Sequence, residues 1–182
     1  FIFIVVMSLS ISQVTVSEIP ALHQILVECG LDLQTRFNLC YWVPPYPLER
    51  MLKDADKMYL YAIKRNYELV GTFTIETKIP SGYLKYGDIN WQNPDLSAFY
   101  IHRLAVLPLF QGKGIGTWCL QQIENLAINH NYSAVRLDAV KVNQKLLEFY
   151  EKSGYKRVGE LIFYPGDKYD DAFVFEKVLT KV

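Results

Sequence analysis

Apolar positions along the chain follow strand spacing in some segments and helix spacing in others, which predicts a mixed α/β protein. Runs rich in β-branched and aromatic residues predict strands over residues 11–16, 58–64, 69–77, 98–106, 134–140, 155–164 and 172–178. Apolar residues at helical spacing predict a helix from Ser17 to Gly30, where the glycine is expected to end it, and further helices over residues 48–54, 115–127 and 143–153. The predicted order βααβββαβαββ suits one mixed sheet covered by helices.

Three connecting segments carry turn or loop signals. Residues 65–68 predict a hairpin turn in which Asn66 takes a positive φ. Residues 41–47, Tyr-Trp-Val-Pro-Pro-Tyr-Pro, predict an aromatic loop, because proline lacks a backbone donor and biases the preceding residue toward extended conformations. Prolines and glycines interrupt residues 78–97, which predicts a long surface loop of the kind that often carries function.

Length, composition and charge limit the classes of function. At 182 residues, with 51% hydrophobic and 21% charged residues, the chain can bury a core without disulfides or metals. Nineteen basic and nineteen acidic residues give no net charge, so we expect neither nucleic acid nor a membrane as partner, and any anion site must be local. Cys29, Cys40 and Cys119 are widely spaced without a metal-ligand pattern, so we expect no metal and a reducing, cytoplasmic setting.

The first residues of the chain need a separate explanation. Residues 1–6 are apolar but too short to span a bilayer, and they lack the basic flank and cleavage site of a signal peptide. We therefore expect residues 1–10 to be an added segment or an N-terminal extension, and residues 11–182 to form a single domain.

A glycine-rich loop lies between a predicted strand and a predicted helix. Gly112, Gly114 and Gly116 alternate there, so backbone N–H groups can converge on an anion with no Cβ in the way. The N-terminus of the following helix adds unsatisfied donors and about half a positive charge. Lys113 can add a side-chain charge. The loop therefore predicts a phosphate or pyrophosphate site.

Two other nucleotide loops fit the spacing less well. The triphosphatase loop needs Gly-x4-Gly-Lys-Ser/Thr, which is absent because Lys113 precedes Gly114. The dinucleotide fingerprint needs a third glycine where Thr117 or Cys119 stands. Asp138, at the end of the next strand, would mimic the ribose-binding acid, so this alternative stays open, as does a simple turn without a ligand.

A family resemblance rests on two segments. The acetyl-CoA-binding signature Gln/Arg-x-x-Gly-x-Gly/Ala of the GNAT superfamily of N-acetyltransferases resembles the segment Gln111-Gly-Lys-Gly-Ile-Gly116 and the strand end Leu104-Ala-Val106 before it. The family's Asn…Tyr-x-x-x-Gly-Phe segment resembles residues 143–155, with Tyr155 in place of the final Phe. The predicted element order also matches that fold, and the resemblance spans roughly residues 11–178.

The resemblance implies a coenzyme A cleft between two splayed strands, 98–106 and 134–140. Backbone groups of Leu104 and Val106 would pair with the pantetheine arm, the glycine loop would hold the pyrophosphate, and Asn143 would contact the cofactor from the other wall. The implied activity is transfer of an acetyl group from acetyl-CoA to a primary amine of a small molecule by direct attack. The expected cofactor-binding residues are Leu104, Ala105, Val106, Gln111, Gly112, Lys113, Gly114, Ile115, Gly116, Thr117, Asn143 and Tyr150.

The chemistry requires a base for the amine, because an alkylamine with a pKa of about 10.4 is protonated at neutral pH. His102 is the first candidate, since strand alternation places it on one face with Tyr100, Leu104 and Val106 unless a bulge intervenes. Arylalkylamine N-acetyltransferases carry a histidine at this position in the proton path, and Tyr100 occupies that group's other histidine position. Glu76 or a water chain is the alternative base, and a packed histidine without a role is the structural alternative.

The departing thiolate needs a proton, and the developing oxyanion needs a donor. The resemblance implies that Tyr150 protonates the thiolate, although a tyrosine on an apolar helix stripe is often simply a core residue. It also implies that a backbone N–H of Val106 or Leu104 stabilises the oxyanion.

The acceptor is the part of the prediction that the sequence leaves most open. Aromatic and acidic residues would either line an acceptor wall or cover the sheet edge: Tyr41, Trp42, Tyr46, Tyr83, Tyr86, Trp91, Asp88 and Asp95. A protein or peptide N-acetyltransferase, which needs an open groove, and a non-catalytic acyl-CoA-binding module are the alternatives, and residues 78–97 decide between pocket and groove. The acyl length and the oligomeric state, a homodimer included, stay open.

Overall fold

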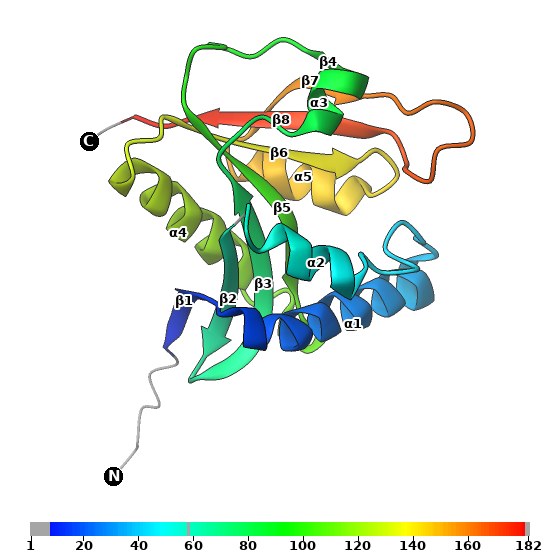
Figure 1. Cartoon of the computed structure of the whole chain (residues 1–182), viewed down its shortest axis with the longest axis vertical. Coiled ribbons are helices and arrows are strands. Elements are labelled where there is room, and N and C mark those ends of the chain that lie inside the picture. The colour runs from blue at the N-terminus through cyan, green and yellow to red at the C-terminus, as the bar shows by residue number, and fades with distance from the viewer. Residues whose placement is uncertain (1–7, 58, 181–182) are drawn as a thin grey trace.

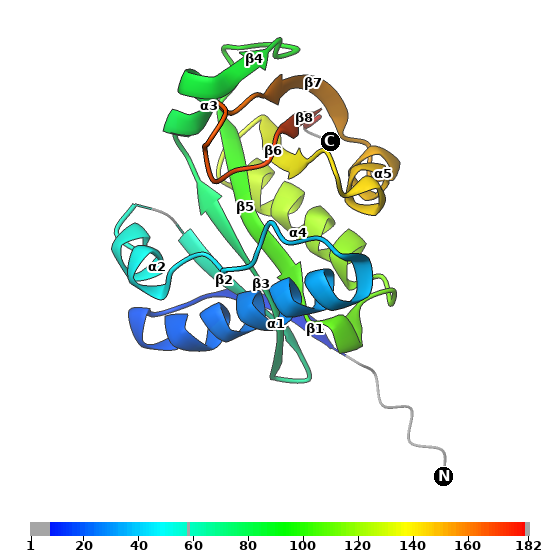
Figure 2. The same cartoon turned by 90° about the vertical axis from the view of Figure 1, so that its right-hand side faces the viewer.

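The computed structural model describes residues 8–57 and 59–180 as a mixed α/β fold with helices on both faces of one sheet (Figures 1 and 2). The strands are β1 (Leu9–Gln13), β2 (Tyr59–Arg65), β3 (Glu68–Glu76), β4 (Gly87–Ile89), β5 (Ala98–Val106), β6 (Ala134–Val140), β7 (Lys156–Leu161) and β8 (Ala172–Val178). The helices are α1 (Ile19–Phe37), α2 (Leu48–Asp54), α3 (Ser81–Tyr86), α4 (Ile115–Asn129) and α5 (Gln144–Lys152), with 3-10 turns at Val16–Glu18 and Pro108–Phe110. The extension expected over residues 1–10 lies mostly outside the described residues, and Leu9 and Ser10 belong to β1.

The described strands form one sheet in the order β1-β2-β3-β5-β6-β8-β7-β4. Neighbours are antiparallel except β5 and β6, which are parallel. The largest core cluster lies between the sheet and the helices α4 and α5, and it includes Phe73, Leu120 and Phe175. On the opposite face, α1 and α2 cover a second cluster, and α3 contributes Tyr83 to a third (Figures 1 and 2).

The parallel strands β5 and β6 pair only over their first halves. Their ladder runs from Ala98 opposite Ala134 to Ile101 opposite Leu137. Beyond these residues, β5 follows β3 as far as Val106, and β6 follows β8 to its end, so the two strands diverge. This confirms the predicted splay of the central strands. We call the divergence after Ile101 and Leu137 the fork.

The first long helix does not end at Gly30, contrary to the prediction. It continues to Phe37, and Asn38 ends it in the left-handed conformation with a φ of 54°. A Cβ on Gly30 would lie 2.6 Å from the carbonyl oxygen of Trp42. Gly30 therefore allows the following loop to pack closely against the helix, a long-range requirement that resembles a helix-end signal in the sequence.

Residues 78–97 are not a loop throughout, which also corrects the prediction. They contain the six-residue α3 and the three-residue β4. Tyr83 anchors α3 because its side chain is buried in a cluster with Tyr100, while β4 pairs with β7 at the sheet edge. Elements this short leave no readable hydrophobic period, so the predicted order lacks one helix and one strand.

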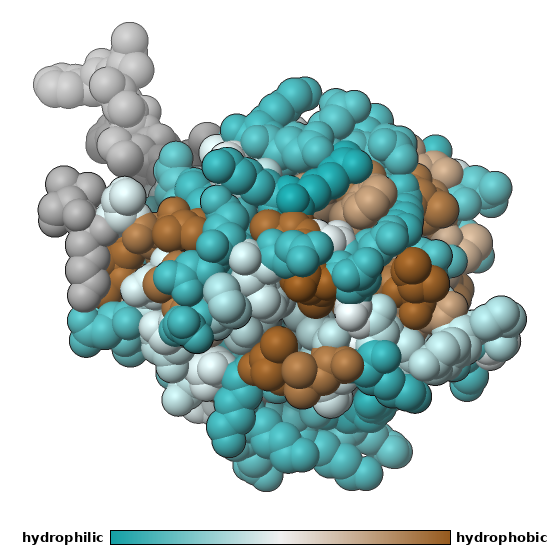
Figure 3. Space-filling view, turned by 90° about the horizontal axis from the view of Figure 1, so that it is seen from above, coloured by the Kyte–Doolittle hydropathy of each residue, from teal (hydrophilic) through white to brown (hydrophobic). Residues whose placement is uncertain are grey.

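The end of the molecule that carries α3 and β4 is largely hydrophilic, and its apolar surface is divided into separate patches (Figure 3). Scattered patches of this kind are ordinary on protein surfaces. Among the described helices, none combines the length and the apolar character needed to cross a membrane.

Candidate active site

The fork leaves one edge of β5 without a strand partner in the described part of the chain. Leu107 N donates to Val70 O on β3 at 2.8 Å, and Ala105 is paired with Thr72 of β3. Because backbone groups alternate along a strand, those of Leu104 and Val106 point away from β3, toward the open edge. An extended ligand can add to this edge as a strand would. Ala105, the third residue expected to contact the cofactor, directs its backbone to β3 instead.

The carbonyl oxygen of Val106 already has two donors. Gln111 Nε2 lies 2.8 Å from it, and Cys29 Sγ lies 3.4 Å from it. Gln111 in turn receives a bond of 3.4 Å from Arg36 Nη2 through its Oε1. The first residue of the glycine signature therefore ties the end of β5 to α1, a structural role that its place in the motif did not indicate.

A bulge separates the candidate base from the open edge. Arg103 has a φ of 52°, and the pairing of β3 with β5 shifts between Thr72 and Thr74. Leu104 and Val106 consequently pack against the core on the α4 and α5 side, whereas Tyr100 lies in the cluster under α3. The expectation that Tyr100 and His102 share a face with Leu104 and Val106 is therefore wrong, because the bulge reverses the alternation.

His102 is held by Glu76 of the neighbouring strand. The distance from His102 Nε2 to Glu76 Oε2 is 3.2 Å, and both side chains are about four-fifths buried. Glu76 lies two residues along β3 from Thr74, the residue opposite His102, so the two side chains are diagonal neighbours on one face of the sheet. The structure thus brings both candidate bases together as one hydrogen-bonded pair.

The glycine loop adopts a backbone conformation that favours glycine at two of its positions. Gly112 and Gly114 have φ values of 72° and 80°, and Gly114 caps the N-terminus of α4. A Cβ on either residue would have no atom within 4 Å, so the loop is open to a ligand. Glycine is favoured at position 116 for a different reason: a Cβ there would lie 3.2 Å from the Phe149 side chain of α5. The N–H groups of Ile115, Gly116 and Thr117 open the first turn of α4.

Cationic side chains lie beside this loop. Lys113 Nζ is 5.7 Å from the centre of the Phe110 ring, and Lys145 Nζ is 4.7 Å from that of Phe37. Together with the N-terminus of α4, these two lysines give a local positive potential in a chain without net charge, whereas the nearby Arg36 is paired with Asp32. These residues fit a pyrophosphate group.

Asn143 forms the opposite wall of the fork. Its Oδ1 accepts from Leu146 N at 3.1 Å and so caps α5, and its Nδ2 donates to the hydroxyl of Tyr41 at 2.7 Å. Tyr41 belongs to the aromatic loop after α1, so the loop expected on the acceptor side touches the wall expected to bind the cofactor. Burial raises the pKa of Tyr41, and the bond from Asn143 opposes this shift.

Tyr150 packs deep in the core but keeps an unused hydroxyl. Its side chain is 5% exposed, and its ring contacts those of Phe149, Tyr155 and Phe175. Burial raises the pKa of Tyr150 well above its usual value, and the charge of Asp138 and the nearby Tyr41 raise it further. Within residues 8–57 and 59–180 the hydroxyl has no hydrogen-bond partner. Its packing and its unused donor fit both readings of this residue, core tyrosine and proton donor.

Sequence reasoning missed two polar clusters under α3. Arg136 and Glu176, opposite each other on β6 and β8, are almost completely buried and bonded at 3.0 Å. Arg136 also donates to Tyr100 Oη at 2.9 Å and to Asn93 O at 3.0 Å. In the second cluster, Tyr83 donates to Asp138 at 2.7 Å. The sequence signal for these clusters is the presence of charged residues inside the otherwise apolar strands β6 and β8.

Four of the six aromatic residues expected to line an acceptor wall fall into two groups. Tyr83 is buried, and Trp91 stacks on it and lies 4.0 Å from the Arg136 guanidinium, so these two act as core. Tyr41 and Tyr46 lie in the loop that faces the fork, where Tyr46 bonds Asp54 and carries Arg103 on its ring at 4.1 Å. The acceptor wall is therefore smaller than the sequence indicates.

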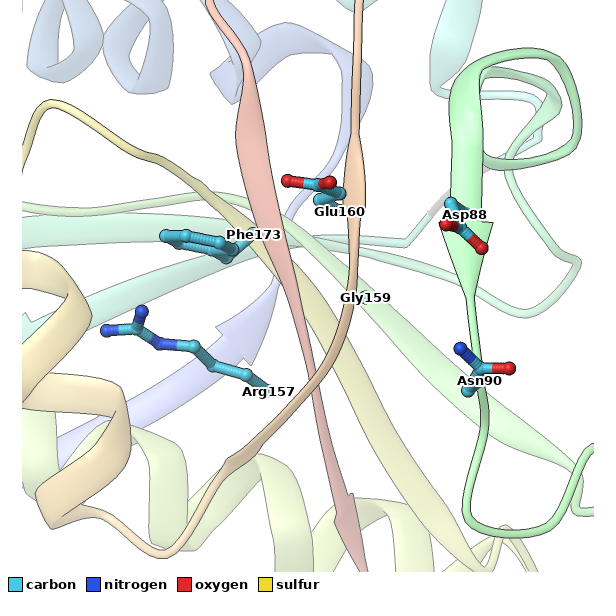
Figure 4. A pocket seen from close by; sticks show the side chains of 6 residues that line it. All are labelled: Asp88, Asn90, Arg157, Gly159, Glu160 and Phe173. Carbon is cyan, nitrogen blue, oxygen red and sulfur yellow. The ribbon is translucent and has the colours of Figure 1, made fainter.

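Asp88 lies away from the fork. It lines an open hollow of about 330 Å³ at the outer edge of the sheet (Figure 4). The hollow is lined by Asp88, Asn90, Arg157, Gly159, Glu160 and Phe173. Asp88 is opposite Glu160, which is opposite Phe173, whose ring packs against the core on the α5 side. This acid therefore occupies the other face of the sheet from His102.

Comparisons with known proteins agree with this geometry. The family model described as "Acetyltransferase (GNAT) family" matches residues 20–155. The chain is 29% identical over 106 residues to the uncharacterized N-acetyltransferase YesJ of Bacillus subtilis, covering 57% of this chain and 56% of YesJ, so the match spans about half of that relative.

Two solved structures show the same fold. A GNAT acetyltransferase from Streptococcus agalactiae superposes with a TM-score of 0.78 at 17% identity, covering 95% of this chain and 96% of that one. The PaiA N-acetyltransferase of Thermoplasma acidophilum, in complex with coenzyme A, gives a TM-score of 0.66 at 17% identity, covering 95% of this chain and 100% of that one. Because the family model matches most of its length and its fold agrees with that of solved members, the chain belongs to the GNAT family of acetyltransferases.

Proposed function

We propose that the chain transfers an acetyl group from acetyl-CoA to a primary amine of a small molecule. One observation carries this proposal. The open backbone edge of Leu104 and Val106 leads directly into the glycine loop, and the Tyr150 hydroxyl, on the α5 side of the diverging strands, has no hydrogen-bond partner among the described residues. The extended pantetheine arm would pair with the strand edge, the pyrophosphate would bind the loop, and the departing thiolate would take its proton from the hydroxyl.

The residues around the fork divide the binding task. Backbone groups of Leu104 and the N–H of Val106 bind the pantetheine arm, since the Val106 carbonyl already accepts from Gln111 and Cys29. The N–H groups of residues 112–117 bind the pyrophosphate, and Asn143 binds from the opposite wall. When bound, acetyl-CoA supplies the thioester-linked acetyl group. The remaining chemistry consists of proton movements by side chains of this chain.

His102 and Tyr150 handle the two protons. Because Glu76 holds Nε2 of His102, the nitrogen left to accept the amine proton is Nδ1, and Glu76 stabilises the resulting imidazolium. The Tyr150 hydroxyl donates to the departing thiolate. A backbone N–H of Leu104 or Val106 stabilises the oxyanion.

The segment before β5 favours a small acceptor over a peptide. Arg136 bonds Asn93 O at 3.0 Å, and Glu176 accepts from Gln92 N at 2.8 Å, so residues 92–93 are fixed to the sheet. With Tyr83 buried, this segment bounds the face that carries His102. A peptide acceptor would need an open groove along that face.

The test is release of coenzyme A thiol over a panel of alkylamines, arylamines and peptides with free amino termini. Acetylation of small amines alone supports the proposal, and acetylation of peptides alone replaces it with peptide N-acetylation. Coenzyme A binding without transfer to any acceptor supports the non-catalytic module.

The protein's own cysteine thiols contribute a background signal to the thiol-release assay. Burial raises the pKa of Cys29 and Cys119 to about 12, whereas Cys40 is exposed. Only the thiolate reacts, so both buried thiols stay protonated and unreactive near pH 8. We expect Ellman's reagent to modify one cysteine per folded chain rapidly, and Cys40→Ser to abolish this reaction. Rapid modification of Cys29 or Cys119 would contradict the burial.

The glycine loop provides a direct test of cofactor binding. Gly114→Ala is expected to weaken coenzyme A binding about 5- to 30-fold, because the free loop of the variant relaxes out of the left-handed conformation and restoring it on binding costs roughly 1–2 kcal/mol. Isothermal titration calorimetry gives the affinity, and Gly82→Ala is the control, since a Cβ there meets open space without a positive φ. Unchanged coenzyme A affinity in Gly114→Ala would mean that the pyrophosphate does not bind at this loop.

A further inference from the structure

Asp138 is the first residue of β6 beyond its ladder with β5. Leu137 is the last residue paired across the fork, and the Asp138 side chain is partly exposed there. Tyr83 of α3 donates its hydroxyl to Asp138 Oδ1 at 2.7 Å. The carboxylate is thus held from one side, while its other oxygen has no hydrogen-bond partner in the described residues.

The alternation of side chains puts Asp138 on the same face as His102. Arg136, two residues earlier on β6, bonds Tyr100, two residues before His102 on β5. Tyr100 is paired directly with Arg136, and the two side chains share one face of the sheet. His102 and Asp138 lie two residues further along β5 and β6, so they are on the same face where the strands diverge. They are the first side chains of each strand on the α3 face after the fork opens.

Asp138 has no cationic partner within the described chain. No Lys, Arg or His nitrogen in residues 8–57 and 59–180 forms an ion pair with it. The nearest cation along its strand, Arg136, is engaged by Glu176, and His102 is engaged by Glu76. Partly buried carboxylates are normally paired, so this charge is available for a ligand.

A second group at the fork is also unused. The Tyr150 hydroxyl has no partner among the described residues although its side chain is 5% exposed. The charge of Asp138 contributes to the raised pKa of Tyr150, so the two groups lie within electrostatic reach of each other. A carboxylate and a hydroxyl, both lacking a full set of partners in the described residues, therefore lie near each other beside the diverging strands β5 and β6.

We propose that Asp138 receives the ammonium group of the acceptor, and that the chain selects alkylamines that are protonated at neutral pH over uncharged arylamines. This inference rests on the proposed acetyl transfer. Tyr83 is a positioning residue, which keeps the carboxylate turned toward the fork. The charge-assisted bond orients the amine before His102 takes its proton.

The experiment compares two isomeric acceptors with the full-length protein. 2-Phenylethylamine is protonated at neutral pH, and 4-ethylaniline is uncharged there because its ring delocalises the nitrogen lone pair. The variant Asp138→Asn keeps the shape of the side chain and can still accept the Tyr83 bond, so folding is preserved. Asp56→Asn removes an equal charge from an exposed turn and is the matched control.

We expect Asp138→Asn to lower kcat/KM for 2-phenylethylamine about 10- to 100-fold, mainly through KM, since bonds to charged groups have this strength. The loss for 4-ethylaniline should be less than about threefold, the affinity for coenzyme A should not change, and Asp56→Asn should behave as wild type. Tyr83→Phe should raise KM for the cationic amine by a smaller factor and leave its kcat near the wild-type value.

Three results would overturn the inference. Equal losses for both amines would mean that Asp138 supports the fold or the chemistry, and no loss for 2-phenylethylamine would mean that it does not touch the acceptor. Failure of the wild type to acetylate 2-phenylethylamine would refute the acceptor class. In that event, thiol release with a peptide amine in the same assay would leave acetyl transfer standing, whereas no release with any acceptor would remove the proposed function as well.

Discussion

Tyr150→Phe is expected to lower kcat by about 10²- to 10⁴-fold, the range typical of losing a proton donor in the transition state. The ring remains, so its contacts with Tyr155 and Phe175 persist and the fold should be unchanged. Coenzyme A affinity should stay close to that of the wild type. Steady-state kinetics with the best acceptor from the amine panel, together with calorimetric titration of coenzyme A, measure both quantities.

The matched control for this variant is Tyr155→Phe. Tyr155 is also a buried tyrosine, but its hydroxyl donates to Glu124 at 3.2 Å, so it already has a partner in the described residues. Loss of kcat only in Tyr150→Phe identifies the unused hydroxyl as the reactive one. Similar losses in both variants would indicate that packing, and not proton donation, explains the effect.

The raised pKa of Tyr150 also predicts a pH dependence. Burial favours the neutral phenol, so the hydroxyl keeps its proton at and above the pH where an exposed tyrosine loses it. We therefore expect no alkaline fall in kcat caused by Tyr150 below a pH of about 10. A fall near neutral pH that disappears in Tyr150→Phe would contradict this assignment.

Glu176→Gln is expected to destabilise the folded chain by about 3–5 kcal/mol, because it leaves the guanidinium of Arg136 buried without its counter-charge. Glu176 is completely buried, Arg136 is 2% exposed, and the carboxylate also accepts from Gln92 N. Urea or guanidinium unfolding followed by circular dichroism measures the free energy of unfolding.

The control for this change is Glu148→Gln. Glu148 and Lys152 form an exposed ion pair one helical turn apart on α5, so its loss should cost less than about 0.5 kcal/mol. A cost below about 1 kcal/mol for Glu176→Gln would mean that the surrounding hydrogen bonds compensate for the missing charge. Replacing Arg136 and Glu176 together by apolar residues should restore part of the stability.

Local features of this chain could be predicted from the sequence. The open glycine loop and the positive φ of Asn66 follow from the chemistry of a few neighbouring residues. The strands 98–106, 134–140 and 172–178 were predicted with their observed bounds, because buried strands carry a strong apolar pattern.

Features that depend on distant contacts could not be predicted. The bulge at Arg103 arises from the register between β3 and β5, and it moves Leu104 to the opposite face from His102. Position 30 requires glycine because the Trp42 backbone approaches it closely, and no local sequence pattern reveals this contact. The sequence indicates Asp138 only as a mimic of a ribose-binding acid, because its hydrogen bond to Tyr83 joins residues 55 positions apart.

The bond between Tyr41 and Asn143 joins segments 102 residues apart and connects the loop after α1, on the proposed acceptor side, with the N-terminus of α5, on the proposed cofactor side. An acceptor that shifts Tyr41 changes what Asn143 can offer the cofactor. By thermodynamic linkage, the cofactor then changes the affinity for that acceptor by the same factor. This linkage would act through one hydrogen bond, and Tyr41→Phe is expected to weaken the coupling between the two binding free energies.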